Sequence, residues 1–215
     1  MHIRGFTSGP LSTNAYLVFD REGGHALLVD APLGSAKKIS QAIETFRLKV
    51  EYIVGTHGHW DQMAEAAALQ EATGATLCAH AWDVTRFNHP EYSLPQGETL
   101  PVKVRPCSPD EYLNDGSTLR IGDVELTVWH TPGHTPGSIC LYVREPSVLF
   151  SGDTLYRSGV GRTDLPGGNL QQLAASLERL GALPDSTWVY PGHGMPTTIG
   201  DERWLLDLSK DVKEA

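Results

Sequence analysis

Long apolar runs are absent from this 215-residue sequence, and so is any surplus of positive charge. No segment approaches the roughly 20 consecutive apolar residues that cross a membrane, and the first residues, MHIRGFTSGPLSTNAY, lack the apolar stretch of a signal peptide. Acidic residues number 26 against 17 Lys and Arg, a formal net charge of −9. Because nucleic acids and anionic membranes bind clustered positive charge, we expect neither as a partner, and we expect a cytoplasmic protein.

Cysteine is also scarce. The three cysteines, Cys78, Cys107 and Cys140, lack the paired spacing of a zinc ribbon or a thioredoxin motif, so disulfides are not expected. Cys78 and Cys140 lie in apolar runs, which favours buried free cysteines over a catalytic thiol.

The rest of the composition, with 40% hydrophobic and 20% charged residues, is ordinary for a globular protein. The length suits one domain over residues 1–215. Two stretches, about 1–83 and 117–200, share an order of strand pair, helix and strand, which indicates the α/β class. Between them, residues 84–116 contain five prolines and little periodicity, and we expect an irregular surface loop there.

Apolar periodicity places the elements within the two halves. Helical spacing predicts helices over about 35–47, 62–73 and 169–180. Strands are predicted for AYLVF, HALLVD, EYIVG and TLCAH in the first half, and for STLRI, VELTVW, SICLYV, SVLF and TWVY in the second. The first two strands flank a turn-like segment and are expected to form a hairpin.

Three potential metal ligands follow the predicted strand EYIV within the segment THGHWDQ at residues 56–62. His57, His59 and Asp61 alternate with residues that do not ligate strongly, so an extended chain points all three the same way. A lone histidine at a strand end is more often a hydrogen-bonded structural residue, but two histidines and an aspartate within five residues favour a ligand set. Neutral imidazole supplies nitrogen at roughly 2.0–2.1 Å from Zn²⁺, and a carboxylate neutralises its charge.

Three further strand ends carry one such residue each, directly after a glycine: His134 in TPGH, Asp153 in SGD and His193 in PGH. A glycine lets the backbone approach a site closely, and sites gather at strand ends. The sequence therefore predicts one metal centre built from His57, His59, Asp61, His134, Asp153 and His193.

These residues resemble the HxHxDH signature and the later single ligands of the metallo-β-lactamase superfamily, and the resemblance spans most of the chain. It implies an αββα sandwich of two mixed sheets flanked by helices. It also implies that His57, His59 and His134 hold one metal, that Asp61 and His193 belong to a second, and that Asp153 bridges the two.

One position departs from this pattern, because the residue after Asp61 should be a histidine of the second metal and is Gln62. An amide oxygen is a weaker ligand for zinc than imidazole. We therefore expect one or two ions per chain, zinc first, with iron or manganese as alternatives.

Within that superfamily, GHTPGS at 133–138, SGDTLY at 151–156 and GVGRTDLPGG at 159–168 resemble the glyoxalase II group. The implied reaction is hydroxyacylglutathione hydrolase-like: metal-bound hydroxide, formed because the ion lowers the pKa of water to about 7, attacks an acyl thioester. Asp61 is the expected catalytic residue that orients the nucleophile and passes its proton on. Full-length members carry a C-terminal helical extension that helps to hold glutathione, whereas ERWLLDLSKDV is enough for one short helix, so glutathione recognition stays open.

Two other functions stay open as well. A persulfide dioxygenase of the same superfamily would use His57, His134 and Asp153 as an iron site of two histidines and one carboxylate. Gln62 also fits a metal- or metabolite-binding protein with impaired catalysis. β-Lactam hydrolysis is not expected, since no export signal is visible.

The small-molecule substrate itself is not specified by the pattern, and neither is the oligomeric state. Trp60, Tyr156 and Tyr190 lie close to predicted ligands and either line the site or pack as ordinary aromatic residues. Arg162 and Asp164 either pair with each other, or Arg162 meets an acidic substrate.

Overall fold

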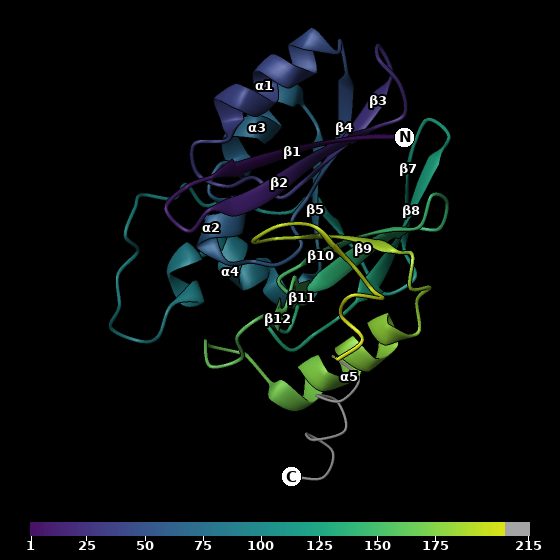
Figure 1. The fold of residues 1–215 in the computed structure, drawn as a ribbon. Helices are drawn as coiled ribbons and strands as arrows, with labels where there is room; N and C mark the ends of the chain where they lie inside the picture. Colours follow the sequence, from purple (N-terminus) through teal and green to yellow (C-terminus); the bar gives the residue numbers. More distant parts are fainter. Residues whose placement is uncertain (205–215) are drawn as a thin grey trace.

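Two β-sheets packed face to face form the centre of the molecule in the computed structural model, which describes residues 1–204 (Figure 1). Helices cover the outer faces of both sheets. Each sheet contains parallel and antiparallel neighbours, so the predicted αββα sandwich of two mixed sheets is confirmed.

The first sheet has the strand order β1-β2-β3-β4-β5-β6. Its strands are β1 (His2–Ser8), β2 (Thr13–Phe19), β3 (His25–Val29), β4 (Lys49–Val54), β5 (Thr76–Ala79) and β6 (Glu111–Tyr112). The predicted hairpin is the antiparallel pair β2 and β3, whereas β3, β4, β5 and β6 are parallel neighbours. The carboxyl ends of the parallel strands meet at one edge, where the chain leaving β4 carries the HGHWD segment.

The second sheet has the order β14-β13-β10-β9-β8-β7. Its strands are β7 (Thr118–Ile121), β8 (Val124–His130), β9 (Ile139–Val143), β10 (Val148–Gly152), β13 (Trp188–Pro191) and β14 (Thr197–Thr198). β10 and β13 are parallel and directly paired, so the segments with Asp153 and His193 leave the sheet side by side. The short pair β11 (Leu155–Tyr156) and β12 (Gly159–Val160) follows β10.

Three apolar clusters define the layers. The central cluster joins the sheets, with Leu27 of the first sheet and Phe150 of the second both fully buried. Leu69 packs in the outer cluster of the first sheet, and Leu173 packs in that of the second. The helices are α1 (Ala36–Thr45), α2 (Trp60–Met63), α3 (Ala66–Thr73), α4 (Val84–Asn88) and α5 (Leu170–Gly181), with 3-10 turns η1 (Ala81–Asp83) and η2 (Pro90–Ser93).

The predicted helix over 62–73 was wrong in its start and its continuity. The segment forms α2, which already begins at Trp60, and then α3. Ala31 separates α2 from α3. Its N–H donates to the Gln62 carbonyl at 2.7 Å, and its own carbonyl accepts from Glu65 N at 2.8 Å. The break leaves α2 as a separate turn that carries two predicted site residues, Asp61 and Gln62.

The irregular loop predicted over 84–116 was also wrong in part, because it contains α4, η2 and β6. α4 is anchored by the fully buried Phe87, but five residues are too few to show a helical period in sequence. β1 was not predicted, since HIRGFTS lies at the sheet edge and lacks a clean apolar alternation. Most of the predicted short C-terminal helix lies outside the described residues.

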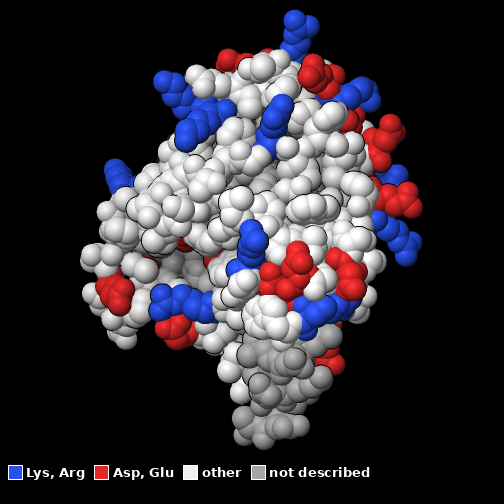
Figure 2. Space-filling model, viewed as in Figure 1, with Lys and Arg blue, Asp and Glu red and all other residues white. Residues whose placement is uncertain are grey.

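Among the helices of residues 1–204, none is long and apolar enough to cross a membrane. On the face shown in Figure 2, Lys and Arg are interspersed with Asp and Glu and form no continuous basic surface.

Candidate metal centre

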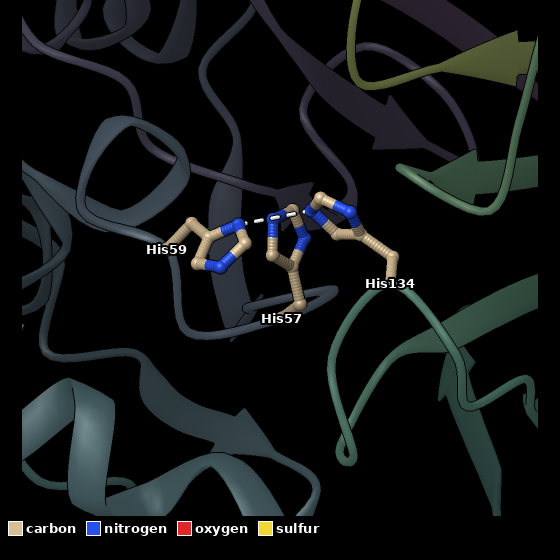
Figure 3. Close-up of side chains that lie close together, drawn as sticks. All are labelled: His57, His59 and His134. Carbon is tan, nitrogen blue, oxygen red and sulfur yellow. Dashed lines mark hydrogen bonds between the residues drawn. The ribbon is translucent and has the colours of Figure 1, made fainter. Parts of the chain in front are cut away.

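Three histidines from both halves of the chain face one another in the interior (Figure 3). His57 and His59 come from the segment between β4 and α2, and His134 follows β8. Each is at most 4% exposed, their ring centroids are 4.6–4.8 Å apart, and their potential ligand atoms all lie within 4.8 Å of one another. The structure therefore brings together the three residues predicted to hold one metal.

Hydrogen bonds determine which nitrogen of each ring faces this centre. His134 Nδ1 donates to the Arg162 carbonyl at 2.7 Å, which leaves the lone pair on Nε2. His134 Nε2 lies 2.9 Å from His59 Nδ1, and the buried His57 Nε2 has no hydrogen-bond partner. A buried nitrogen without a hydrogen-bond partner costs folding free energy. Together with the two neighbouring imidazole nitrogens, however, it forms the set of ligand atoms that a divalent cation such as Zn²⁺ requires.

Burial also keeps these rings in the state that binds metal. Desolvation, followed by the charge of neighbouring His134, lowers the pKa of His57 and of His59 well below the ordinary value. Both imidazoles are therefore neutral at pH 7, as a metal ligand must be.

Asp153 is the fourth group at this centre. Its Oδ2 lies 3.4 Å from His134 Nε2, 3.9 Å from His57 Nε2 and 3.5 Å from His193 Nε2. Burial raises the pKa of Asp153 because no solvent stabilises its charge, although His134 and His193 oppose the shift. This carboxylate therefore lies between the three histidines and a second cluster. That is the position predicted for a ligand that bridges two metal ions.

The second cluster consists of Asp61, Gln62 and His193, and its groups other than Gln62 Oε1 are paired with one another or with nearby residues. Asp61 Oδ2 accepts from Thr13 Oγ1 at 2.8 Å and lies 3.3 Å from His193 Nε2, while His193 Nδ1 donates to the Leu11 carbonyl at 3.1 Å. Burial would lower the pKa of His193, but Asp61 and Asp153 outweigh it and raise this pKa to about 9. Burial would raise the pKa of Asp61, yet hydrogen bonds from His193 and Thr13 lower it.

Gln62 presents its amide nitrogen to these groups. Its Nε2 donates to Asp153 Oδ1 at 3.0 Å and lies 3.3 Å from His193 Nε2, whereas the buried Oε1 has no partner. An amide N–H has no lone pair for a cation. Gln62 thus supplies a proton donor at the position where the family pattern has a metal-binding histidine.

A cavity of about 500 Å³ opens above both clusters. Its lining residues are Leu11, His59, Trp60, Asp61, Ser93, Leu94, Pro95, Glu98, His134, Asp153, Tyr156, Val160, Arg162, Leu165 and His193. The cavity therefore combines an apolar wall with the candidate ligand groups, the usual composition of a small-molecule site.

The remaining residues singled out from the sequence divide between the cavity and the core. Trp60 lines the cavity and also packs in the core of the first sheet, and Tyr156 lines the cavity with its ring edge-on to His193. Tyr190 instead packs against aromatic rings between the sheets. Arg162 and Asp164 form a two-point ion pair at 2.7 and 2.6 Å, which also lowers the pKa of Asp164 to about 2.

Several buried residues that support the ligands were not predicted. Asp30 Oδ1 accepts from Thr56 N at 2.8 Å and so fixes the backbone just before His57. Asp83 bonds to Gly58 N, between the first two ligands. Asp30 ends the predicted strand HALLVD, a position that resembles those of the ligands, but nothing in the sequence around Asp83 distinguishes it from an ordinary loop aspartate.

Comparison with known sequences matches residues 8–193 to the Metallo-beta-lactamase superfamily. An uncharacterized protein of Aquifex aeolicus is 41% identical over 94% of both chains. The Probable metallo-hydrolase YqgX of Bacillus subtilis is 32% identical over 94% of this chain and 95% of its own. The Hydroxyacylglutathione hydrolase GloC of Haemophilus influenzae is 34% identical over 88% of this chain and 89% of its own.

Solved structures agree with this match. The BLEG-1 B3 metallo-beta-lactamase superposes with a TM-score of 0.84 at 32% identity, covering 94% of this chain and 96% of its own. ETHE1 from Myxococcus xanthus gives a TM-score of 0.77 at 31% identity, with 94% and 82% covered. TTHA1623, solved in a di-iron-bound form, gives 0.75 at 36% identity, with 93% and 96% covered. The chain therefore belongs to the metallo-beta-lactamase superfamily, shares its fold, and brings together three histidines that could hold a metal ion.

Proposed function

We propose that this protein hydrolyses acyl thioesters with one metal ion, held by His57, His59 and His134. The observation that carries the proposal is the difference between the two clusters: three imidazoles converge and His57 Nε2 has no hydrogen-bond partner, while the Gln62 amide donates to Asp153 in the neighbouring cluster. The similarity to GloC, a hydroxyacylglutathione hydrolase by name, supports a thioester as substrate.

A divalent ion in the three-histidine centre would lower the pKa of a water molecule to about 7 and polarise the substrate carbonyl. With such an ion bound, Asp61 would orient the attacking water and accept its proton, because its lowered pKa keeps the carboxylate ionised at pH 7. Thr13 holds Asp61 for this role through the bond to Oδ2. The C–O bond forms as the C–S bond breaks, and a thiolate is a good leaving group that needs little further assistance.

The cavity wall suits an apolar acyl group. Leu11, Leu94, Val160 and Leu165 line it beside the metal-ligating groups. Arg162 is the arginine of this lining, and its guanidinium is already paired with Asp164, just as His193 is already paired with Asp61. We therefore propose a neutral, apolar acyl portion in preference to one that carries a carboxylate.

A substrate panel tests this proposal. Protein loaded separately with zinc, iron and manganese is assayed with S-lactoylglutathione, simple aliphatic acyl thioesters and a chromogenic β-lactam. Thiol release from a thioester, dependent on the metal, is expected. Tightly bound metal with no turnover of any thioester would reject the proposal and favour a binding protein, and cleavage of the β-lactam alone would assign a different hydrolase.

A second candidate is a persulfide dioxygenase. His57 Nε2, His134 Nε2 and Asp153 Oδ2 converge within 3.4–3.9 Å, the ligand types of a two-histidine, one-carboxylate iron site. The likeness to ETHE1 from Myxococcus xanthus supports it, as does 30% identity to the mouse protein named Persulfide dioxygenase ETHE1, over 90% of this chain and 70% of that one. Oxygen uptake by the iron-loaded protein with glutathione persulfide, in the absence of thioesterase activity, would favour this function over hydrolysis.

A further inference from the structure

A fully buried carboxylate connects the two loops that carry the histidines. Asp83, the last residue of η1, is 0% exposed and does not line the cavity. It accepts four hydrogen bonds, from Gly58 N at 2.8 Å, Gly137 N at 2.9 Å, Thr135 Oγ1 at 2.6 Å and Arg86 Nη1 at 3.1 Å. A buried carboxylate is tolerated only when it is fully paired, and here every partner is a donor.

The partners of Asp83 adjoin the ligands. Gly58 lies between His57 and His59, and Thr135 directly follows His134. Oδ2 of Asp83 bonds to both Gly58 and Thr135, so one oxygen atom joins the ligand loop of the first half to that of the second.

Arg86 extends the connection to a third loop. Its Nη2 donates to the Pro166 carbonyl at 2.6 Å. Pro166 belongs to the stretch whose Arg162 carbonyl accepts from His134 Nδ1 and so orients that ring. The pair Asp83 and Arg86 therefore contacts both the loop that follows His134 and the loop whose Arg162 carbonyl orients its ring.

Close packing of the loops against this pair accounts for the glycines of three motifs. A Cβ atom at Gly58 would lie 2.6 Å from Arg86 Cβ, one at Gly137 would lie 2.7 Å from Asp83, and one at Gly167 would lie 2.5 Å from Arg86 Nη2. Any side chain at these positions would push its loop away from the pair. The three loops thus approach Asp83 and Arg86 as closely as backbone permits.

We propose that Asp83, supported by Arg86, is a positioning residue that sets the separation between the His57–His59 loop and the His134 loop, and thereby the affinity of the site for metal. A backbone bond from Ile139 N to the Thr56 carbonyl, at 2.9 Å, links the same two segments nearer the sheets. Loss of Asp83 therefore loosens the three-histidine centre without separating the loops.

The test replaces Asp83 by Asn, which keeps the shape but turns one acceptor oxygen into an NH₂ group facing donors. Zn²⁺ affinity of the full chain is measured by competition with a chromophoric chelator, and Co²⁺ absorption reports the coordination geometry. Asp83→Asn is expected to weaken Zn²⁺ binding by about 10–100-fold, the usual effect of losing a group that orients ligands, and to alter the Co²⁺ spectrum.

Glu202→Gln is the matched control. Glu202 is 2% exposed and accepts from Ser158 N, Thr197 Oγ1 and Trp204 Nε1, none of which belongs to a histidine ligand or its neighbour. Both variants are expected to lower the Tm of the metal-free protein, but Glu202→Gln should leave the Zn²⁺ affinity and the Co²⁺ spectrum unchanged. Equal Zn²⁺ affinity in Asp83→Asn and the unmodified chain would overturn the proposal.

Arg86→Lys covers the case in which Asp83→Asn does not fold. Lysine keeps the positive charge but lacks the fork that reaches both Asp83 and Pro166, so a smaller loss of Zn²⁺ affinity is expected. Unchanged affinity and Co²⁺ spectrum in this variant would also contradict the proposal. Because the probe is metal alone, the result does not depend on whether the substrate is a thioester.

Discussion

The two clusters below the cavity contain similar residue types but differ in what their side chains do. In the three-histidine centre, buried imidazole nitrogens converge, and both His57 Nε2 and His59 Nε2 have no hydrogen-bond partner. In the neighbouring cluster, Asp61 is bonded by Thr13 and paired with His193, and Gln62 donates to Asp153. Apart from Gln62 Oε1, which has no partner, the polar atoms of this cluster already satisfy one another, whereas His57 Nε2 in the three-histidine centre is left unpaired and available to a cation.

Removing a histidine from the first centre should have the largest effect. His57→Ala and His134→Ala are each expected to abolish stoichiometric metal binding and to lower kcat/KM for the thioester by about a thousandfold or more, about 4 kcal/mol at 1.36 kcal/mol per tenfold. Metal content after gel filtration and initial rates measure both. His25→Ala, which removes a histidine paired with Glu51 on the first sheet, is the control and should leave both values unchanged.

Asp61→Asn in the second cluster should have a different signature. The rate is expected to fall by about a hundredfold, because the amide no longer accepts a proton, while the metal content of the three-histidine centre is retained. The exposed Asp164→Asn is the control for loss of one carboxylate that does not line the cavity. Loss of metal together with activity in Asp61→Asn would mean that Asp61 holds the ion, and the distinction between the clusters would fail.

Gln62→His should make the second cluster resemble the first. The imidazole replaces an amide that donates to Asp153, so metal content is expected to rise from about one toward two ions per chain. Gln62→Met, of similar length but without ligand atoms, should stay at one. Unchanged metal stoichiometry in Gln62→His would show that the Gln62 amide is not what prevents this cluster from binding a second ion.

The smallest effects are expected in the pH dependence of the metal-free protein. His57 has a folded pKa far below 6.5, so the unfolded chain binds its proton more readily and stability falls as the pH drops below about 6.5. His193 has a folded pKa of about 9, so its stabilising contribution is complete below 6.5 and is lost as the pH rises through 9. The Tm of the metal-free protein, measured with a chelator present from pH 5 to 10, should therefore fall at both the acidic and the alkaline end of this range.

The variant His193→Gln separates the acidic decline in Tm from the alkaline decline. This variant should lose the alkaline decline in Tm and keep the acidic one, because it leaves the three buried imidazoles intact. An alkaline decline of the same size in the variant would contradict the assignment to His193.

Much of the fold could be predicted because its signals are local. Apolar runs such as SICLYV and TWVY correspond to β9 and β13, and the helix expected over 169–180 is α5, which begins after Asn169 caps Gln172 N at 2.9 Å. The predictions failed where contacts distant in sequence decide the structure. Ala31 divides the helix expected over 62–73, and the buried Phe87 stabilises a helix in a region that looks irregular.

The candidate ligands could likewise be picked out from pattern alone, since alternation after EYIV and glycine before His134, Asp153 and His193 are properties of short segments, and the structure brings His57, His59 and His134 together. The pattern could not show how these residues divide. His57 and His134 are 77 positions apart, and their rings meet only because the two sheets pack face to face and place both strand ends at one edge. The same packing turns the Gln62 amide nitrogen toward Asp153 and buries Asp83 between the loops. Residue types and spacing therefore sufficed to locate a metal site, whereas the tertiary structure decided which of its groups are free to bind a cation, because hydrogen-bond satisfaction depends on neighbours that the chain brings together only on folding.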